Sequence, residues 1–245
     1  MKETLRCLWA IVKLFFKSLP VIRKGKKMSI PERWEYTYQF LRPECEKFMK
    51  ATGSRIVYHG LENIPERKKG DMGLLFVGNH QSYLDIPGLL SVMDMPTSFV
   101  AKSELETTPM VGELIKNSGG LLIDQHNIRQ NVEVIKLASE NLQNGLNMVI
   151  FPEGARSLGI KMGEFKRGSL KAASYVGADI VPFRIENMWA VLEGNGKLKV
   201  VPRQVDIFFG KPISTKDMDR KEIFDLGGSM KDIIIALDPD DHGLH

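Results

Sequence analysis

Apolar residues dominate the start of the chain and leave room for one polar stripe. Residues 5–19 contain eleven apolar side chains out of fifteen. Basic residues at positions 2, 6, 13 and 17 are four, seven and four apart, so a helix would place them on one narrow face. The pattern therefore predicts an amphipathic helix. We expect Pro20 to end it, because proline lacks an N–H donor and clashes with the preceding turn.

A second helix is predicted directly after this one. Ser29 and Glu32 have the spacing of a capping box, and Pro31 suits a first helical turn. Apolar side chains then recur at steps of four and three residues from position 34 to position 48, which is one face of a helix. Pro43 should kink or break that helix. We expect the two segments to form a helical hairpin with its turn at residues 24–27.

The pattern changes after residue 53, where short apolar runs alternate with helical stretches. The expected strands are residues 55–58, 73–77, 97–101, 121–123, 148–151, 180–185, 197–201 and 204–208, and the last two should form an antiparallel hairpin. The expected helices are residues 84–93, 109–117, 127–143, 167–177 and 215–236. This alternation predicts an α/β fold with a mixed, largely parallel sheet flanked by helices. We therefore divide the chain into a helical segment, 1–52, and an α/β domain, 53–245.

The composition excludes several classes of protein, and the distribution of charge indicates a kind of binding partner. Apolar residues make up 43% of the 245 residues and charged residues 26%, which excludes a mainly disordered or fibrous chain. Two cysteines cannot supply a disulfide framework or a four-thiolate zinc site, and we expect no metal. The net charge of +4 is uneven, because residues 1–30 carry +7 and the remainder −3. Such a basic arm indicates an anionic surface as partner.

A membrane surface fits this arm better than nucleic acid, because its apolar face is large and aliphatic. The apolar run is too short and too interrupted to span a bilayer, and no signal-peptide cleavage site follows it. A helix lying in the membrane interface fits best, and the alternatives are a helix packed on the protein's own core or a true span. The side chains expected to contact lipid are Lys2, Arg6, Leu8, Trp9, Val12, Lys13, Phe15, Phe16, Lys17, Arg23, Lys24, Lys26 and Lys27.

Candidate chemistry lies where the expected strands end, which is where open α/β sheets bind ligands. His80 and Asp85 follow the strand at 73–77 and are separated by five positions, across a turn. We expect the carboxylate to reach one imidazole nitrogen and make the other a base that can accept a proton from an alcohol. No serine or cysteine has the spacing of a protein nucleophile, so such a base would activate the substrate itself. A purely structural histidine is the alternative.

Anion contacts are predicted after the neighbouring strands. Gly154 and Arg156 follow the strand at 148–151, and an arginine fork there could hold phosphate oxygens or form an ordinary ion pair. Glu153 could orient this loop or hold a hydroxyl. Lys102 ends the strand at 97–101, and Lys166-Arg167 precedes an expected helix; each is either an anion contact or a solvated charge.

Taken together and in order, these segments resemble the glycerolipid acyltransferase superfamily, in particular its lysophosphatidic acid acyltransferases. The N-H-x4-D motif stands at residues 79–85, and Phe-Pro-Glu-Gly-Ala-Arg-Ser at 151–157 has alanine where the family has threonine. Gly-Gly-Leu-Leu-Ile-Asp at 119–124 is followed by Gln125 where the family has arginine, and Val-Pro stands at 181–182. The resemblance covers about residues 55–212.

The resemblance implies transfer of a fatty acyl group from an acyl-carrier-protein or coenzyme A thioester to the sn-2 hydroxyl of lysophosphatidic acid, without an acyl-enzyme. His80 would be the general base and Asp85 its orienter. It implies no cofactor and a peripheral site on the cytoplasmic face of the cell membrane. The alternatives are another acceptor, such as glycerol 3-phosphate, or a membrane-binding module without catalysis. The residues implied in phosphate binding are Lys102, Glu153, Gly154 and Arg156, with Gln125, Lys166 and Arg167 as further candidates.

Overall fold

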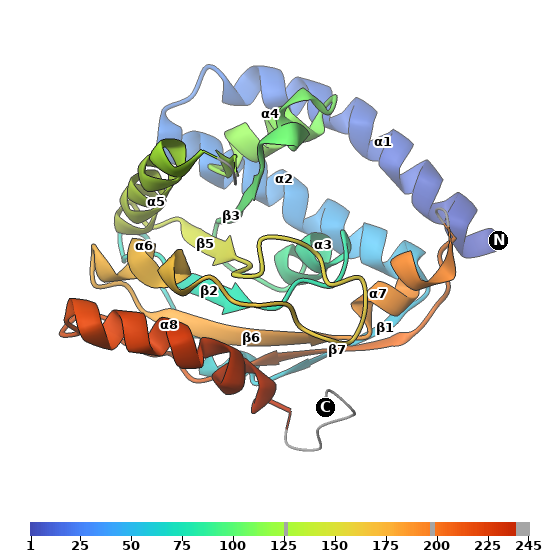
Figure 1. The fold of residues 1–245 in the computed structure, drawn as a ribbon. Helices are drawn as coiled ribbons and strands as arrows, with labels where there is room; N and C mark the ends of the chain where they lie inside the picture. Colours follow the sequence, from blue (N-terminus) through green and yellow to red (C-terminus); the bar gives the residue numbers. More distant parts are fainter. Residues whose placement is uncertain (125–126, 197–198, 239–245) are drawn as a thin grey trace.

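The first two helices form the expected antiparallel hairpin, α1 (Lys2–Gly25) and α2 (Ile30–Ala51), which runs along one side of the molecule (Figure 1). The structure is a computed structural model, and it describes residues 1–124, 127–196 and 199–238, without the side chains of residues 128 and 129. The capping box at the start of α2 is present, since Ser29 Oγ lies 2.6 Å from Glu32 Oε2. The hairpin prediction is therefore confirmed.

Neither proline ends its helix, so the expected stop at Pro20 is wrong, and of the kink or break expected at Pro43 a break is excluded. Val21 and Ile22, directly after Pro20, are buried against the body of the protein. Tyr38 and Met49 lie on either side of Pro43 and belong to the same hydrophobic core. Burial of side chains before and after each proline outweighs the one backbone hydrogen bond that the proline removes.

Seven strands form one sheet in the order β1-β7-β6-β2-β5-β3-β4. All neighbours are parallel except β6 and β7, which are antiparallel, so the expected mixed and largely parallel sheet is confirmed. The strands are β1 (Arg55–His59), β2 (Leu75–Gly78), β3 (Thr97–Lys102), β4 (Leu121–Ile123), β5 (Asn147–Ile150), β6 (Ile180–Glu186) and β7 (Gln204–Phe209).

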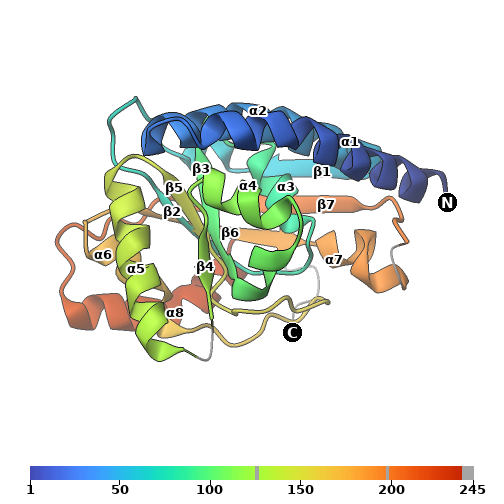
Figure 2. The same cartoon turned by 90° about the horizontal axis from the view of Figure 1, so that it is seen from above.

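Helices cover the two faces of the sheet, as Figure 2 shows from above. The remaining α-helices are α3 (Asp85–Leu90), α4 (Val111–Asn117), α5 (Ile128–Gln143), α6 (Lys171–Ser174), α7 (Met188–Val191) and α8 (Arg220–Ile235). Short 3-10 helices are η1 (Leu61–Asn63), η2 (Ser103–Thr107), η3 (Arg167–Leu170) and η4 (Glu193–Asn195). One core joins α2, α3 and α7 to the sheet, and the second joins α5, α6 and α8 to it. Strand residues with both faces covered explain the unbroken apolar runs in the sequence.

The expected hairpin of residues 197–201 and 204–208 does not form. β7 instead pairs with β1 and β6, and residues 199–203 are not a strand. The N–H of Val201 donates to the carbonyl of Val191 at 2.9 Å, so this segment packs on α7. Residues 197–198 lie outside the described part of the chain.

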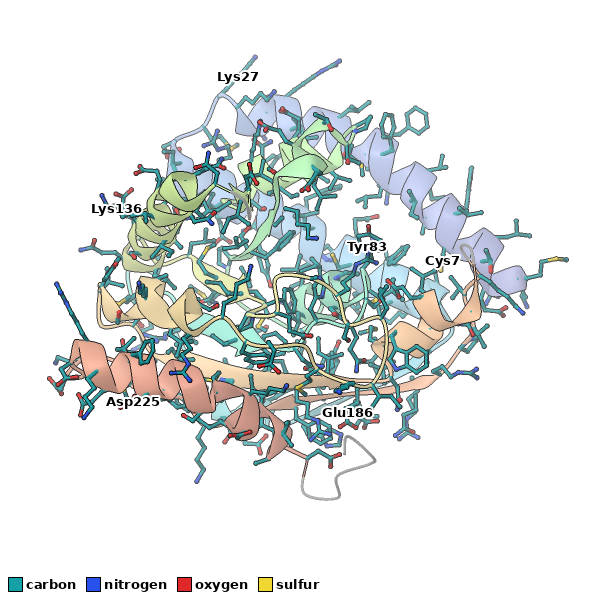
Figure 3. All side chains as sticks on the ribbon, viewed as in Figure 1. Cys7, Lys27, Tyr83, Lys136, Glu186 and Asp225 are labelled. Atoms are coloured by element: carbon teal, nitrogen blue, oxygen red, sulfur yellow. The ribbon has the colours of Figure 1, made fainter. Side chains whose placement is uncertain are left out.

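Helix α1 packs along a narrow line and leaves most of its apolar surface exposed. Trp9 is 60% and Phe16 66% exposed, although Cys7 between the helix and the body is buried (Figure 3). We call the exposed apolar side chains the apolar strip: Leu5, Leu8, Trp9, Ile11, Val12, Phe15, Phe16 and Leu19. Within the described chain, neither α1 nor any other helix is long and apolar enough to cross a membrane.

Polar contacts hold α1 to the rest of the protein along its length. They join Val200 N–H to Thr4 Oγ1 (3.1 Å), Lys17 to Glu44 (2.9 Å), the Asn117 amide to the Ile22 carbonyl (3.3 Å) and Lys26 to Glu113 (2.5 Å). Two of the lysines expected to meet lipid, Lys17 and Lys26, are therefore already paired with carboxylates. The division into a segment 1–52 and a domain 53–245 stays a prediction.

Candidate active site

One edge of the sheet collects the residues that the sequence singled out. Strands β2, β3, β4, β5 and β6 are parallel, so their carboxyl ends lie at the same edge. His80 follows β2, Lys102 ends β3, and Glu153 to Arg156 follow β5. The topology alone thus brings together groups that are up to 76 positions apart in the chain.

His80 and Asp85 form a hydrogen-bonded pair at this edge. The Nδ1–H of His80 donates to Asp85 Oδ2 at 2.7 Å, which confirms the contact expected from their spacing. The same oxygen accepts the backbone N–H groups of Gln81 (2.6 Å) and Ser82 (2.9 Å), so the turn itself holds the carboxylate. The imidazole also stacks on Phe151, with 4.0 Å between ring centroids. These contacts fix the plane and the tautomer of the ring.

The surroundings of the pair favour a base at Nε2. Asp85 is fully buried, and burial raises the pKa of its carboxyl above the usual range, although the hydrogen bonds from His80 and the two backbone groups oppose that rise. Among the described residues, Nε2 of His80 has no hydrogen-bond partner, and the side chain is 18% exposed. An ionised Asp85 would leave the lone pair of Nε2 ready to accept a proton.

Glu153 ties the loop after β5 to the turn after β2. Its Oε1 accepts the backbone N–H of His80 at 2.7 Å, and its Oε2 accepts that of Gly163 at 2.6 Å. Burial raises the pKa of this carboxyl too, against the effect of these two bonds. The N–H of Ser157 also donates to the His80 carbonyl at 2.7 Å. Glu153 was expected near a phosphate, and both of its oxygens here orient the backbone.

Arg156 lies beside the turn that carries His80 and Asp85, and two contacts hold its side chain. Its Nη1 donates to Glu193 Oε1 at 3.0 Å. Its guanidinium carbon lies 3.5 Å from the centroid of the Tyr83 ring, and Figure 3 labels Tyr83 between α3 and α7. No hydrogen bond among the described residues engages Nε or Nη2, so that edge of the fork remains for an anion.

The other residues expected to bind phosphate lie farther out. Lys102 is exposed at the end of β3, and Lys166 is exposed next to η3. Arg167 lies over the Phe224 ring of α8 at 4.7 Å, which draws its side chain to that helix. Gly154 has φ of +69°, a left-handed conformation that favours glycine in this tight loop. Gln125 lies outside the described residues.

Sequence reasoning missed the end of β6 and the segment that follows it. Both ends of the Asn79 amide bond the backbone of Ile185 at 2.8 Å, and Gln81 Oε1 accepts the N–H of Met188 at 3.0 Å. Asn79 was visible as part of the N-H-x4-D motif, but nothing in the sequence pairs it with Ile185. Glu193 belongs to no motif, so only the folded chain reveals it.

The arrangement combines a partly exposed histidine, bonded to a buried carboxylate, with an arginine that presents one edge of its guanidinium. It suits removal of a proton from a hydroxyl of an anionic substrate. Within residues 1–124, 127–196 and 199–238, no three His, Cys, Asp or Glu side chains are grouped so that they could hold a metal ion.

Known proteins are similar to this chain in fold and in sequence. The crystal structure of the 1-acyl-sn-glycerophosphate (LPA) acyltransferase PlsC from Thermotoga maritima matches 95% of this chain and 91% of its own, with a TM-score of 0.77 and 27% identity. A probable 1-acyl-sn-glycerol-3-phosphate acyltransferase of Mycoplasma pneumoniae is 29% identical over 199 residues, which are 76% of this chain and 73% of that protein. The enzyme so named from Neisseria gonorrhoeae is 32% identical over 136 residues, 55% of this chain and 51% of that protein.

Coverage differs among these relatives. The match to the enzyme of Chlamydomonas reinhardtii is 28% identical and spans 65% of this chain, but only 47% of the algal protein. The chain thus spans about half the length of several curated relatives that it matches. The Acyltransferase family model matches residues 55–186, which are more than half of the chain and include the loops that follow β2, β3 and β5. The chain therefore belongs to the acyltransferase family.

Proposed function

We propose that this protein transfers a fatty acyl group from a thioester of acyl carrier protein or coenzyme A to the sn-2 hydroxyl of lysophosphatidic acid. The product is phosphatidic acid. The observation that carries the proposal is the His80–Asp85 pair, 2.7 Å apart and fully buried on the carboxylate side, next to the half-engaged fork of Arg156. Relatives and a solved structure that carry this activity in their names support the choice of acceptor.

The proposed reaction needs no covalent enzyme intermediate. Nε2 of His80 takes the proton of the acceptor hydroxyl as the oxygen bonds to the thioester carbonyl carbon, whose π electrons move to its oxygen. The carbonyl re-forms, the carbon–sulfur bond breaks, and the leaving thiolate takes the proton from His80. Asp85 stabilises the imidazolium that exists between the two transfers.

Arg156 would bind the phosphate of the acceptor, and Lys102 and the Gly154 loop would add to the site. A guanidinium offers two parallel N–H donors to a phosphate, whereas a lysine offers a point charge. Glu153 would contribute by fixing the loop rather than by touching the anion, since its two oxygens already accept backbone N–H groups. Gln125 replaces the arginine found in the family's second motif, so Arg156 would contribute a larger share of the binding of the phosphate.

The acceptor and the product are amphiphiles, so the enzyme would work at the cytoplasmic face of the cell membrane. The apolar strip of α1 supports this, because contiguous exposed apolar side chains of this size mark an interaction surface. The exposed basic residues of the arm would add about 1 kcal/mol each at an anionic surface. Lys13 and Arg23 are exposed, whereas Lys17 forms an ion pair with Glu44.

Turnover tests the reaction. The full chain is incubated with vesicles that contain lysophosphatidic acid and with an acyl thioester, and phosphatidic acid is measured by chromatography. Phosphatidic acid should appear with one thiol released per ester formed. Turnover of glycerol 3-phosphate or another lysophospholipid instead would favour a different acceptor, and no turnover of any acceptor would favour a membrane-binding module.

Vesicle binding tests the membrane surface separately. The double variant Trp9→Glu and Phe16→Glu should leave the folded protein in the supernatant after sedimentation with anionic vesicles. Both side chains are exposed, so the core is untouched. The matched control is Val132→Glu on α5, also exposed, which should sediment like the unaltered protein. Equal sedimentation of all three proteins would refute α1 as the anchor.

A further inference from the structure

Three side chains or backbone groups of the catalytic region converge on the carboxylate of Glu193. Its Oε1 accepts from Arg156 Nη1 at 3.0 Å and from the backbone N–H of Tyr83 at 2.9 Å. Its Oε2 accepts from Ser82 Oγ at 2.6 Å. The carboxylate therefore joins the loop after β5 to the turn between His80 and Asp85, across 111 positions of sequence from Ser82.

Glu193 itself lies on a segment that is bonded alongside the turn carrying His80 and Asp85. Asn79 bonds Ile185 and Gln81 bonds Met188, so the chain from β6 to η4 runs alongside the turn from its first residue to its fourth. Glu193 is the last contact of this series, and its side chain is only 12% exposed. A carboxylate that is largely shielded from solvent and accepts three hydrogen bonds is held in one position, and it restricts the positions of the groups that donate to it.

Arg156 gains its orientation from this carboxylate. Glu193 engages Nη1 and the Tyr83 ring lies under the guanidinium, so both the direction and the plane of the fork are set. An arginine side chain has four rotatable torsions and loses much of its affinity for an anion if they must be ordered on binding. A guanidinium held in advance binds a phosphate at lower entropic cost.

We propose that Glu193 is a positioning residue that fixes the guanidinium of Arg156 against the turn carrying His80. It thereby sets where the phosphate of the acceptor lies relative to the base. The inference rests on the proposed function for the identity of that acceptor. Its own content is that Glu193 acts on phosphate binding through Arg156.

A double-mutant cycle on the full chain tests this, with glycerol 3-phosphate as the probe and calorimetry as the readout. Glu193→Gln should weaken the Kd about 10-fold, the size of one charge-assisted hydrogen bond. Arg156→Ala should weaken it at least as much, and the double variant should be within about 2-fold of Arg156→Ala, because the two residues act through one contact. The control is Glu44→Gln, a carboxylate paired with Lys17 and 13% exposed, which should bind like the unaltered protein.

A second variant protects the test against misfolding of Glu193→Gln. Tyr83→Leu removes the ring under the guanidinium, at a side chain that is mostly exposed, and it should also weaken binding of the probe. When it is added to Arg156→Ala, the further loss of binding should be no more than about 2-fold. Additive losses, or unchanged binding in Glu193→Gln, would overturn the proposal, and so would an unaltered protein that does not bind the probe. Turnover is measured in parallel. If the double-mutant cycle gives the expected result but no acyl group is transferred, the proposed reaction alone is refuted. If turnover is normal but the losses in the cycle are additive, the positioning role alone is refuted.

Discussion

Two histidine–aspartate pairs in this molecule have nearly the same bonded geometry. His80 Nδ1 lies 2.7 Å from Asp85, and His59 Nε2 lies 2.9 Å from Asp206. Each imidazole also stacks on a phenylalanine that neighbours it in space, with ring centroids 4.0 Å and 4.4 Å apart. A search for such pairs by distance alone would not separate them.

Their surroundings differ in burial and in charge. The side chains of His80 and Asp85 are 18% and 0% exposed, whereas those of His59 and Asp206 are 43% and 17% exposed. The second pair lines a hollow together with two more carboxylates, Glu186 and Asp238, and one lysine, Lys211. Glu186 and Asp238 are already paired with the buried Arg184, whereas Arg156 beside the first pair keeps guanidinium donors that can hold an anion. The two pairs thus differ in their surroundings and not in their own geometry.

The largest effect that would separate the pairs is on turnover. His80→Ala should lower kcat by about 10²-fold or more, since a general base commonly supplies that much. His59→Ala should leave kcat within about 2-fold, because its pair lies on another face of the sheet. Both variants are assayed for phosphatidic acid under saturating substrates. A near-normal His80→Ala, or an equal loss in both, would abolish the distinction.

A smaller effect is expected from the carboxylates. Asp85→Asn should reduce kcat by about 10-fold or more, yet by no more than His80→Ala, because Asp85 acts through His80. Asp206→Asn is its matched control and should be active. Asp85→Asn with normal kcat would show that the tautomer of His80 is fixed by other groups.

The contribution of Asp85 to the free energy of unfolding should change with pH. Burial raises the folded-state pKa of Asp85 above its unfolded value of about 3.9, so the folded protein gives up stability as pH rises through that window. Asn does not ionise, so the stability of Asp85→Asn relative to the unaltered protein should rise as pH increases above about 4, by about 1.4 kcal/mol for each unit by which the pKa is raised. Urea unfolding at several pH values measures the difference. A difference that is constant with pH, or that has the opposite slope, would contradict the raised pKa.

The smallest effect concerns the outer pair by itself. An exposed histidine–carboxylate pair contributes little, so His59→Ala should change the free energy of unfolding by about 0.5 kcal/mol or less beyond the loss of its stacking on Phe208. Urea denaturation at pH 7 checks this, with Phe208→Leu as the reference for stacking. A loss above about 2 kcal/mol would mean that the outer pair is a structural element of the sheet.

Much of the fold was predictable, because it follows from local patterns. The apolar runs at 74–77 and 148–151 indicated covered strands, and the spacing of His80 and Asp85 indicated their hydrogen bond. The errors arose where distant contacts decide. Pro20 and Pro43 remain inside helices because packing holds both sides, and β7 pairs with β1 and β6 rather than with its neighbour in sequence.

The candidate site divides in the same way. Arg156 and Glu153 were found from their motif, but their contacts were not, since Glu193 lies 37 positions beyond Arg156 and no spacing rule links them. Gln125 was found as a departure from the family pattern. The motifs supplied His80, Asp85, Glu153 and Arg156, and the folded chain added Glu193, which holds Arg156 from a distant segment.

The attachment of α1 has a kinetic consequence. Contacts from Thr4 to Lys26 tie this helix to the body along its length, so the apolar strip cannot swing independently of the sheet. If the strip lies in a bilayer, the whole enzyme is confined there in a set orientation. The rate would then follow the mole fraction of acceptor in the surface and not its bulk concentration. Adding inert lipid at constant total acceptor would slow the enzyme, which is the behaviour called surface dilution.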